Sequence, residues 1–369
     1  MVNPAAPGAG MRFVPVTAFR VVDTRNATGA FGGPSLAAGT PRSFAIQTAD
    51  SAIPAAALAY SLNITVVPSG TLQSLTVYPT GQSQPAQALM SSDGRVKAQA
   101  AIVPAGTGGA ITVAASNGTN VIIDVNGYFV PAANTSGLAF YPVTPKRLFD
   151  TRTSGTALTA GQTRTFAIQS TAAIPATAQA YSLNLTAVPS GSLGYLTAWP
   201  AGQTQPGVST LNAGAGVTAN AAIVAAGTGG GISVFSSGNT NLLIDIDGYW
   251  APPGTGGLSL YPVTPARIYN SGTADVSGTI AVPAPAASTN IPGTAQALLL
   301  NATVTPPASF GYLALWAAGT SQPNSSTLNA GDGAVTSNLA IVGATNGSIN
   351  AFASNPTLLT LDAYGYFAP

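Results

Sequence analysis

Apolar and polar side chains alternate with a period of two over many short runs of this chain. Between Tyr60 and Val67, every second residue is large and apolar, and the residues between them are mostly Ser, Asn and Thr. This alternation is typical of a half-buried β-strand. Further short apolar runs, separated by turns rich in Pro, Ser, Gly, Thr and Asn, occur at residues 196–200, 221–224, 232–235 and 242–246.

The spacing of these runs predicts about eight strands in each stretch of about 120 residues. Such a stretch is too long for one turn of a solenoid, so the pattern indicates a β-sandwich of the jelly-roll kind. We expect helix only as a single turn, for example around Ala55–Leu58. The glycine-rich segment Gly106–Gly109 is expected to form a hairpin turn and not a phosphate-binding loop. The predicted fold class is all-β.

One sequence unit occurs three times, which is the strongest signal in the chain. It opens with Tyr-Pro-Val-Thr-Pro-x-Arg-x-x-Asp-Thr-Arg or a variant of it, within 13–25, 140–152 and 260–272. A central Leu-Asn-x-Thr motif follows, starting at Leu62, Leu183 and Leu300. Each copy ends with Asp-x-x-Gly-Tyr and an aromatic residue, starting at Asp124, Asp245 and Asp362.

The repeats divide the chain into three tandem sandwich domains at 11–131, 138–251 and 258–369, after an N-terminal extension over 1–10. The two connecting segments are short and consist of Pro, Gly, Ala, Ser, Thr and Asn: Pro131–Gly137 and Pro252–Gly257. Short tethers keep neighbouring domains in contact. A stiff linear array and a compact pseudo-threefold cluster both satisfy this constraint, and we slightly favour the cluster.

Composition removes several classes of function. Charged residues make up 6% of the chain and the net charge is +1, so no basic stripe is present for nucleic acid. Cys and His are absent, which removes thiolate metal sites, the commonest metal ligand and the commonest general base. No apolar run is long enough for membrane insertion. We therefore expect a protein that is not an enzyme and binds no cofactor or metal.

Pairs of Arg and Asp recur at fixed positions in the repeats. An Asp-Thr-Arg triplet at 23–25 and 150–152, together with the closing Asp124 and Asp245, could supply an acid/base pair or a cation site, but the third repeat has Asn270-Ser-Gly272 in place of the triplet. An Arg of the opening motif and the closing Asp are present in all three copies. We therefore expect structural ion pairs that tie the first strand of each repeat to its last: Arg20 with Asp124, Arg147 with Asp245, and Arg267 with Asp362.

Asparagine recurs in two contexts. Asn63, Asn184 and Asn301 lie in Leu-Asn-x-Thr sequons but inside predicted strands, so we expect hydrogen bonds to a neighbouring loop rather than glycosylation. Should the chain meet the glycosylation machinery, the better acceptors are the loop sequons at Asn117, Asn134, Asn324 and Asn346.

One aromatic residue of each repeat precedes a Gly-x-x-Gln-Pro loop in the same register: Tyr78, Trp199 and Trp316. Two interpretations remain open. Such rings stack on the faces of sugars in carbohydrate-binding modules, and three matched sites would add avidity. Alternatively, they pack in the core or at the rim of the sandwich, which we favour.

The combined motifs resemble a tandem repeat module found in secreted bacterial surface proteins. The resemblance covers all three copies and is clearest at 140–250. It implies an extracellular, non-catalytic β-module and carries no established activity. The first copy departs at Met90-Ser91, where the others have Leu-Asn, and the third departs at 270–272.

These observations favour a structural or assembly protein of the cell surface or extracellular space: a surface layer, fibre or particle subunit whose main partner is another copy of itself. The alternative is an adhesin module that binds carbohydrate or cell-wall polysaccharide. A third reading is a component of a phage or injection particle. No signal peptide is visible at the start of the sequence, and the residues do not indicate an export route.

Overall fold

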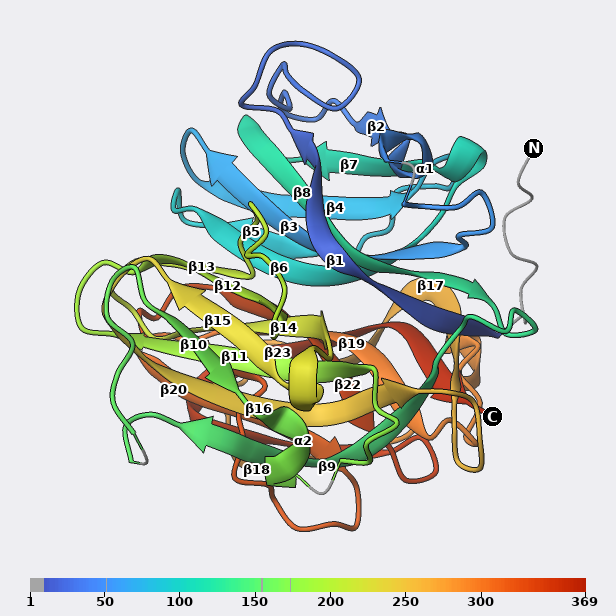
Figure 1. Cartoon of the computed structure of the whole chain (residues 1–369), viewed down its shortest axis with the longest axis vertical. Helices are drawn as coiled ribbons and strands as arrows, with labels where there is room; N and C mark the ends of the chain where they lie inside the picture. The colour runs from blue at the N-terminus through green and yellow to red at the C-terminus, as the bar shows by residue number, and fades with distance from the viewer. Residues whose placement is uncertain (1–9, 51, 154, 173) are drawn as a thin grey trace.

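The computed structural model describes residues 10–50, 52–153, 155–172 and 174–369. The chain is all-β, with 56% of residues in strands and 5% in helices, and its sheets are large and antiparallel (Figure 1). The predicted fold class is therefore confirmed at this level. The proposed N-terminal extension lies, apart from Gly10, outside the described residues.

The first repeat contributes strands to two sheets. Its large sheet has the order β6-β3-β8-β1, and its small sheet has the order β2-β7-β4-β5. The bounds are β1 (Met11–Asp23), β2 (Arg42–Phe44), β3 (Ala59–Pro68), β4 (Leu72–Pro79), β5 (Met90–Ser92), β6 (Lys97–Pro104), β7 (Ile111–Ala115) and β8 (Thr119–Pro131). A one-turn helix α1 (Ile46–Ala49) and a 3₁₀ turn η1 (Thr107–Gly109) complete it.

The second repeat has the same arrangement, with the orders β14-β11-β16-β9 and β10-β15-β12-β13. Its elements are β9 (Ala139–Asp150), β10 (Thr163–Phe166), α2 (Ile168–Ala172), β11 (Ala180–Pro189), β12 (Gly194–Pro200), β13 (Leu211–Ala213), β14 (Thr218–Ala225), η2 (Thr228–Gly230), β15 (Ile232–Ser236) and β16 (Thr240–Ala251).

The third repeat differs because one long strand belongs to both of its layers. The first half of that strand, β23, pairs with β18 and β20, and its second half pairs with β17 and β19. The elements are β17 (Ser259–Asn270), β18 (Val276–Val282), η3 (Ala287–Thr289), β19 (Ala297–Thr305), β20 (Phe310–Ala317), β21 (Leu328–Ala330), β22 (Thr336–Gly343) and β23 (Ile349–Ala368).

Two local expectations are wrong. Residues 55–56 form a turn closed by the Ala57 N–H and the Pro54 carbonyl, and the helical turn lies earlier, at α1. The Gln47 side chain donates to the carbonyls of Pro54 and Ala55, which holds the turn against α1. The segment 106–109 is not a hairpin, because β6 pairs with β3 whereas β7 pairs with β2 and β4; it crosses between sheets.

Each repeat has its own apolar core between its large and small sheets. In the first repeat, the apolar residues of β3 face this core, as the alternation predicts. The polar residues of β3, however, are also buried: Ser61, Asn63 and Thr65 are at most 8% exposed. A strand with two buried faces must be covered twice. The second cover comes from another repeat.

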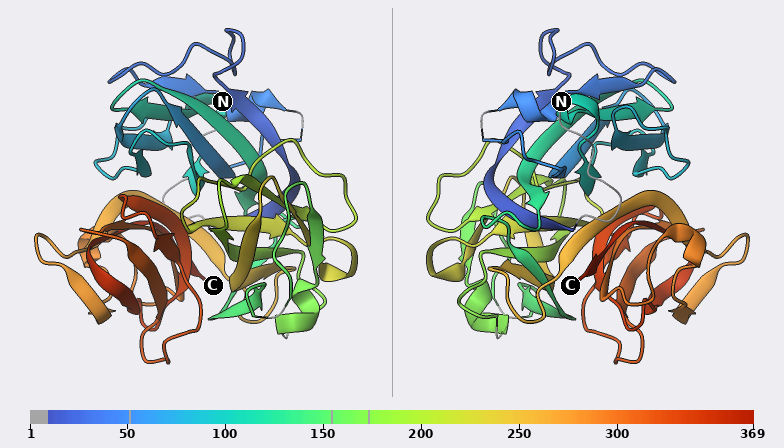
Figure 2. Two further views of the ribbon diagram at one scale, coloured as in Figure 1. Left: turned by 90° about the vertical axis from the view of Figure 1, so that its left-hand side faces the viewer. Right: turned by 90° about the vertical axis from the view of Figure 1, so that its right-hand side faces the viewer.

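The three repeats gather around a common centre, as the blue, green and orange lobes of Figure 2 show. A fourth apolar core lies among them and takes residues from all three. It includes Phe13, Phe129, Phe140, Trp250 and Phe367, whose ring centroids lie 4.7–5.8 Å apart in the contacting pairs. Burial of aromatic side chains is a large stabilising contribution. The repeats therefore form one body with a shared core.

The glycine of the closing motif in the first two repeats fits this shared core. A Cβ atom on Gly127 would lie 2.2 Å from the Phe13 ring, and one on Gly248 would lie 2.3 Å from the Phe140 ring. In each case the ring occupies the space of the missing side chain. The Asp-x-x-Gly-Tyr motif thus has a packing reason for its glycine.

The ring of repeats closes through backbone pairing. Phe13 bridges Leu138, Phe140 bridges Leu258, and Met11 pairs with Leu260. The last of these joins the start of the described chain to the third repeat. Every repeat is thereby linked to both others by main-chain contacts near the aromatic core.

Candidate functional site

The Arg and Asp residues of the opening and closing motifs lie face to face between the first and last strands of each repeat. In each pair the guanidinium group lies side-on to the carboxylate, with Nε donating to one oxygen and Nη2 to the other. This bidentate geometry strengthens the ion pair. The aspartates are at most 3% exposed. The Nε to Oδ1 distances are 2.9 Å in Arg20–Asp124, 2.7 Å in Arg147–Asp245 and 2.8 Å in Arg267–Asp362.

The Asp-Thr-Arg triplets extend two of these pairs. Arg25 donates to Asp23, and Arg152 donates to Asp150. The guanidinium contacts hold the pKa of both Asp23 and Asp150 below the ordinary value. Burial instead raises the pKa of Asp124 to about 6, against the opposing effect of Arg20. In each of the two repeats the carboxylates share an arginine, since Arg20 contacts both Asp23 and Asp124, and Arg147 contacts both Asp150 and Asp245.

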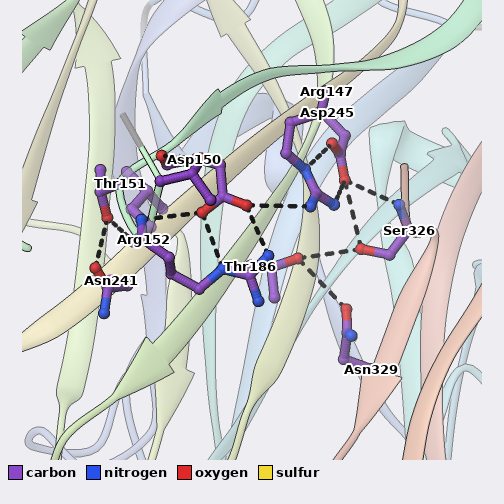
Figure 3. Close-up of polar contacts among 11 residues, drawn as sticks. Arg147, Asp150, Thr151, Arg152, Thr186, Asn241, Asp245, Ser326 and Asn329 are labelled. Atoms are coloured by element: carbon purple, nitrogen blue, oxygen red, sulfur yellow. Dashed lines mark hydrogen bonds and ion pairs between the residues drawn. The ribbon is translucent and has the colours of Figure 1, made fainter. Parts of the chain in front are cut away.

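Asp245 also reaches the next repeat. Its Oδ2 accepts a hydrogen bond of 2.9 Å from the Ser326 N–H, and the Ser326 hydroxyl lies 3.4 Å away (Figure 3). The Thr186 hydroxyl lies 3.4 Å from both the Ser326 hydroxyl and the Asn329 amide oxygen. The ion pair of the second repeat is therefore continuous with a polar contact to a loop of the third.

The asparagines of the Leu-Asn-x-Thr motif make the same contact in a cycle. Each donates its Nδ2 to a loop carbonyl of the following repeat, and the third donates to the first. The bonds are Asn63 to Ser209 at 2.6 Å, Asn184 to Ser326 at 2.6 Å, and Asn301 to Ala88 and Leu89 at 3.1 and 3.0 Å. The three acceptor loops lie at corresponding positions of the sequence repeat.

A second set of amides completes this cycle. The side-chain amide on the sixth strand of each repeat donates to the oxygen of one of these asparagines: Asn220 to Asn63 at 2.9 Å, Asn338 to Asn184 at 3.0 Å, and Gln99 to Asn301 at 2.7 Å. All six side chains are at most 8% exposed. Buried amides with their hydrogen bonds made are costly to disrupt. We call this arrangement the amide ring.

Sequence reasoning missed the partners in the amide ring. It placed the first three asparagines in strands and expected loop hydrogen bonds, but the loops belong to other repeats. The signal that was available is the recurrence of Gln or Asn at position 99 and its counterparts 220 and 338, in the same register as the Leu-Asn-x-Thr motif. Periodicity within one repeat carries no information on which repeat covers a given face.

The aromatic residues proposed for sugar stacking lie in the interior. Tyr78, Trp199 and Trp316 are 8%, 4% and 2% exposed. The indole N–H groups of Trp199 and Trp316 donate to the carbonyls of Gln203 and Thr320, within the Gly-x-x-Gln-Pro loops that follow them. A ring with so little exposed surface has no free face for a pyranose, so this placement argues against the stacking role and agrees with packing.

The loop asparagines proposed as glycosylation acceptors lie at or near the surface. Asn117, Asn324 and Asn346 are exposed, and Asn134 is half-buried. Asn117 donates to the carbonyl of Thr71, and Asn134 accepts from the backbone and hydroxyl of Ser136.

A charged cluster between the first and third repeats was not predicted from the sequence. Arg95 forms ion pairs with Asp93 and with Asp332 of the third repeat, and Lys97 donates to the Val335 carbonyl. The pKa of Lys97 is lowered by burial, and that of Asp93 is lowered by Arg95.

The cluster borders a cavity of about 50 Å³ lined by all three repeats. A second cavity of about 30 Å³ lies beside Asn63 and Asp124. Both are large enough for a few waters and far below the size of ligand pockets.

The described residues contain no group of three or more Asp side chains placed to hold a metal ion. No helix in the described part of the chain is long and apolar enough to cross a membrane. The recurring polar residues are thus mostly engaged in contacts between strands and between repeats.

No model of a known protein family matches this sequence, and no curated protein sequence matches it.

Proposed function

We propose that this chain is a non-catalytic structural or assembly protein of the cell exterior, built from three β-modules that act as one rigid body. The observation that carries the proposal is the amide ring. The polar side chains that recur in every repeat are buried at the contacts between repeats and bonded there. Polar groups that are buried and bonded in this way stabilise the packing of the three repeats. They also leave an exterior that is nearly neutral and suited to contact with other copies of the chain.

In this proposal each repeat is a jelly-roll sandwich. The strand orders 6-3-8-1 and 2-7-4-5 of the first repeat, with matching orders in the second, support it. The boundaries at 11–131, 138–251 and 258–369 follow the three separate apolar cores. The location outside the cell rests on the resemblance to secreted bacterial surface modules.

Negative-stain electron microscopy of the purified chain tests the proposal. We expect ordered assemblies, such as filaments, lattices or particles of defined copy number. Dispersed single particles at every protein concentration and salt concentration would contradict it.

A second function, carbohydrate binding, is favoured by a different set of aromatic residues. The small sheet of the second repeat carries Tyr195, which is 37% exposed, with its ring 5.7 Å from that of Phe235. The third repeat carries Tyr312 and Phe352 at the same positions, 5.5 Å apart and partly exposed. Adjacent exposed rings of this kind can stack on sugar faces.

Retention on a column of cell-wall polysaccharide tests this alternative. Retention that is lost in a Tyr195→Ala and Tyr312→Ala double variant would support it. A matched control is Ser74→Ala, since Ser74 is the counterpart of these tyrosines in the first repeat. Equal elution of all three proteins with the void volume would exclude it.

A further inference from the structure

The first strand of each small sheet is an edge strand. Within the described residues β2 pairs only with β7, β10 only with β15, and β18 only with β23. The other side of each strand presents main-chain N–H and C=O groups that no strand covers. Such an edge is a template for pairing with another chain unless the protein blocks it.

The first two repeats block this edge with arginine. Arg42 lies opposite Val113, and its guanidinium carbon is 4.7 Å from the centre of the Phe44 ring on the core side of the strand. It donates to the carbonyls of Pro34 and Gly29, in the loop that precedes the strand. A charge pointing inward on an edge strand is a known protection against edge-to-edge pairing.

The second repeat repeats these contacts. Arg164 lies opposite Val234, 6.0 Å from the centre of the Phe166 ring, and donates to the carbonyls of Thr156 and Ala157. In both repeats the arginine therefore binds the preceding loop to the edge strand. The loop and the charge protect the edge together.

The third repeat lacks both protections. Ile280 lies opposite Ala351, which is the register of Arg42 and Arg164, and its side chain packs against the core. The segment before the edge strand spans only 271–275, compared with 24–41 and 151–162 in the other repeats. The strand residues Thr279 and Ala281 are exposed. Figure 1 shows β18 at the periphery of the molecule, far from β2.

We propose that the β18 edge joins two copies of this chain by antiparallel strand pairing across a twofold axis. The inference goes beyond the proposed function, which names no contact between copies. A β-bulge at Gly278, where the register shifts, limits the regular pairing to Gly278–Val282. An antiparallel edge of this kind is complementary to itself, because each strand offers the same alternating donors and acceptors.

A second copy is the occupant that the local chemistry favours. The paired stretch Thr279-Ile-Ala-Val282 carries no charge, and the chain has a net charge of +1, so two copies meet with little repulsion. The nearest charge along the sequence is Asp275, which precedes both β18 and the bulge. In the symmetric register centred on Ile280, which pairs Gly278 with Val282, the two Asp275 side chains lie at opposite ends of the contact. Small exposed side chains at 279 and 281 allow close approach.

Light scattering coupled to size-exclusion chromatography tests the inference on the full chain. We expect the wild type to elute with twice the chain mass of 36.4 kDa at high concentration. Ile280→Arg, which restores the residue type of the other repeats, is expected to give the single-chain mass. Ile280→Val is the control that keeps an apolar edge and should keep the double mass.

Two further outcomes decide the matter. Amide hydrogen exchange of the wild type should show protection of residues 279–282 that increases with protein concentration, a readout that does not depend on the folding of any variant. An Ile280→Arg protein that keeps the double mass would overturn the β18 contact and leave the proposed assembly function standing. A wild type of single-chain mass at all concentrations, without ordered assemblies, would overturn both.

Discussion

Replacing Asn184 with leucine measures what the amide ring contributes to stability. Asn184 is 3% exposed, donates to the Ser326 carbonyl at 2.6 Å and accepts from the Asn338 amide at 3.0 Å. Leucine has a similar volume but neither group, so it leaves one buried acceptor and one buried donor with a lost partner. Each such loss costs about 1–3 kcal/mol, and the Asn338 amide keeps its bond to Thr327. We expect a loss of about 3 kcal/mol in the free energy of unfolding.

The same variant tells whether the three repeats unfold together. The entropy of unfolding is about 2.1 cal/mol/K per residue, so a body of 369 residues loses about 4 °C in Tm for about 3 kcal/mol. A repeat of about 120 residues that unfolds alone would lose about 12 °C for the same change. The shared aromatic core and the cyclic contacts predict one transition and the smaller shift.

Differential scanning calorimetry provides both quantities. Asn324→Leu is the matched control, because Asn324 is exposed, and its effect should stay within about 0.5 kcal/mol. A single transition that moves by about 4 °C supports the reasoning. Separate transitions, of which only one moves, would refute the single body. An Asn184→Leu protein as stable as the control would refute the role of the amide ring.

Three further predictions concern single residues of the second repeat. Arg147→Met leaves the buried Asp245 without its cation and should cost about 3–5 kcal/mol in chemical denaturation, whereas a cost below about 1 kcal/mol would mean that the pair is dispensable. The pKa of Asp247 is raised to about 8 by burial and by the neighbouring Asp245, so the folded state holds a proton that the unfolded state has lost, and stability should fall as pH rises from about 4 to 8. Asp247→Asn, which installs the residue that the first repeat has there, should leave only the smaller fall below about pH 6 that the raised pKa of Asp124 contributes, when Tm is followed across that range; an unchanged pH profile would contradict the assignment. Gly248→Ala should cost about 1–3 kcal/mol in thermal unfolding because its Cβ meets the Phe140 ring, and a neutral effect would show that the ring can move aside.

The sequence contains most of the fold within a repeat and little of the fold between repeats. Alternation from Tyr60 to Val67 identifies the strand and the apolar face that lines its own core. It identifies Asn63 as a hydrogen-bonding residue but not Ser209 as its acceptor, because the two are 146 residues apart. The two-residue periodicity of a strand indicates which side chains share a face of the sheet. It does not indicate which other part of the chain covers that face.

The aromatic residues also show that the sequence pattern does not indicate which side chains are covered. Trp199 and Tyr195 lie on one strand with the same spacing parity, so sequence pattern does not separate them. Trp199 is covered by the loop to which its indole N–H is bonded, and Tyr195 has no such cover. The difference depends on the path of a loop, which local propensities do not determine. The partly exposed pair Tyr312 and Phe352 of the third repeat was missed for the same reason.

The backbone pairing of Met11 with Leu260, which joins the first repeat to the third, has a consequence for biosynthesis. Ribosomes deliver the first repeat long before the third exists, and the partners of the Asn301 amide are 212 and 213 residues upstream of it. Until the last third of the chain has been synthesised, the surface of the first two repeats that the third repeat will cover stays exposed. Its apolar side chains and amide groups then lack their partners. Contacts of such sequence separation form slowly, and incomplete chains with such a flank are prone to aggregate. Truncation or premature termination should therefore reduce the yield of folded protein far more here than in an array whose modules fold independently.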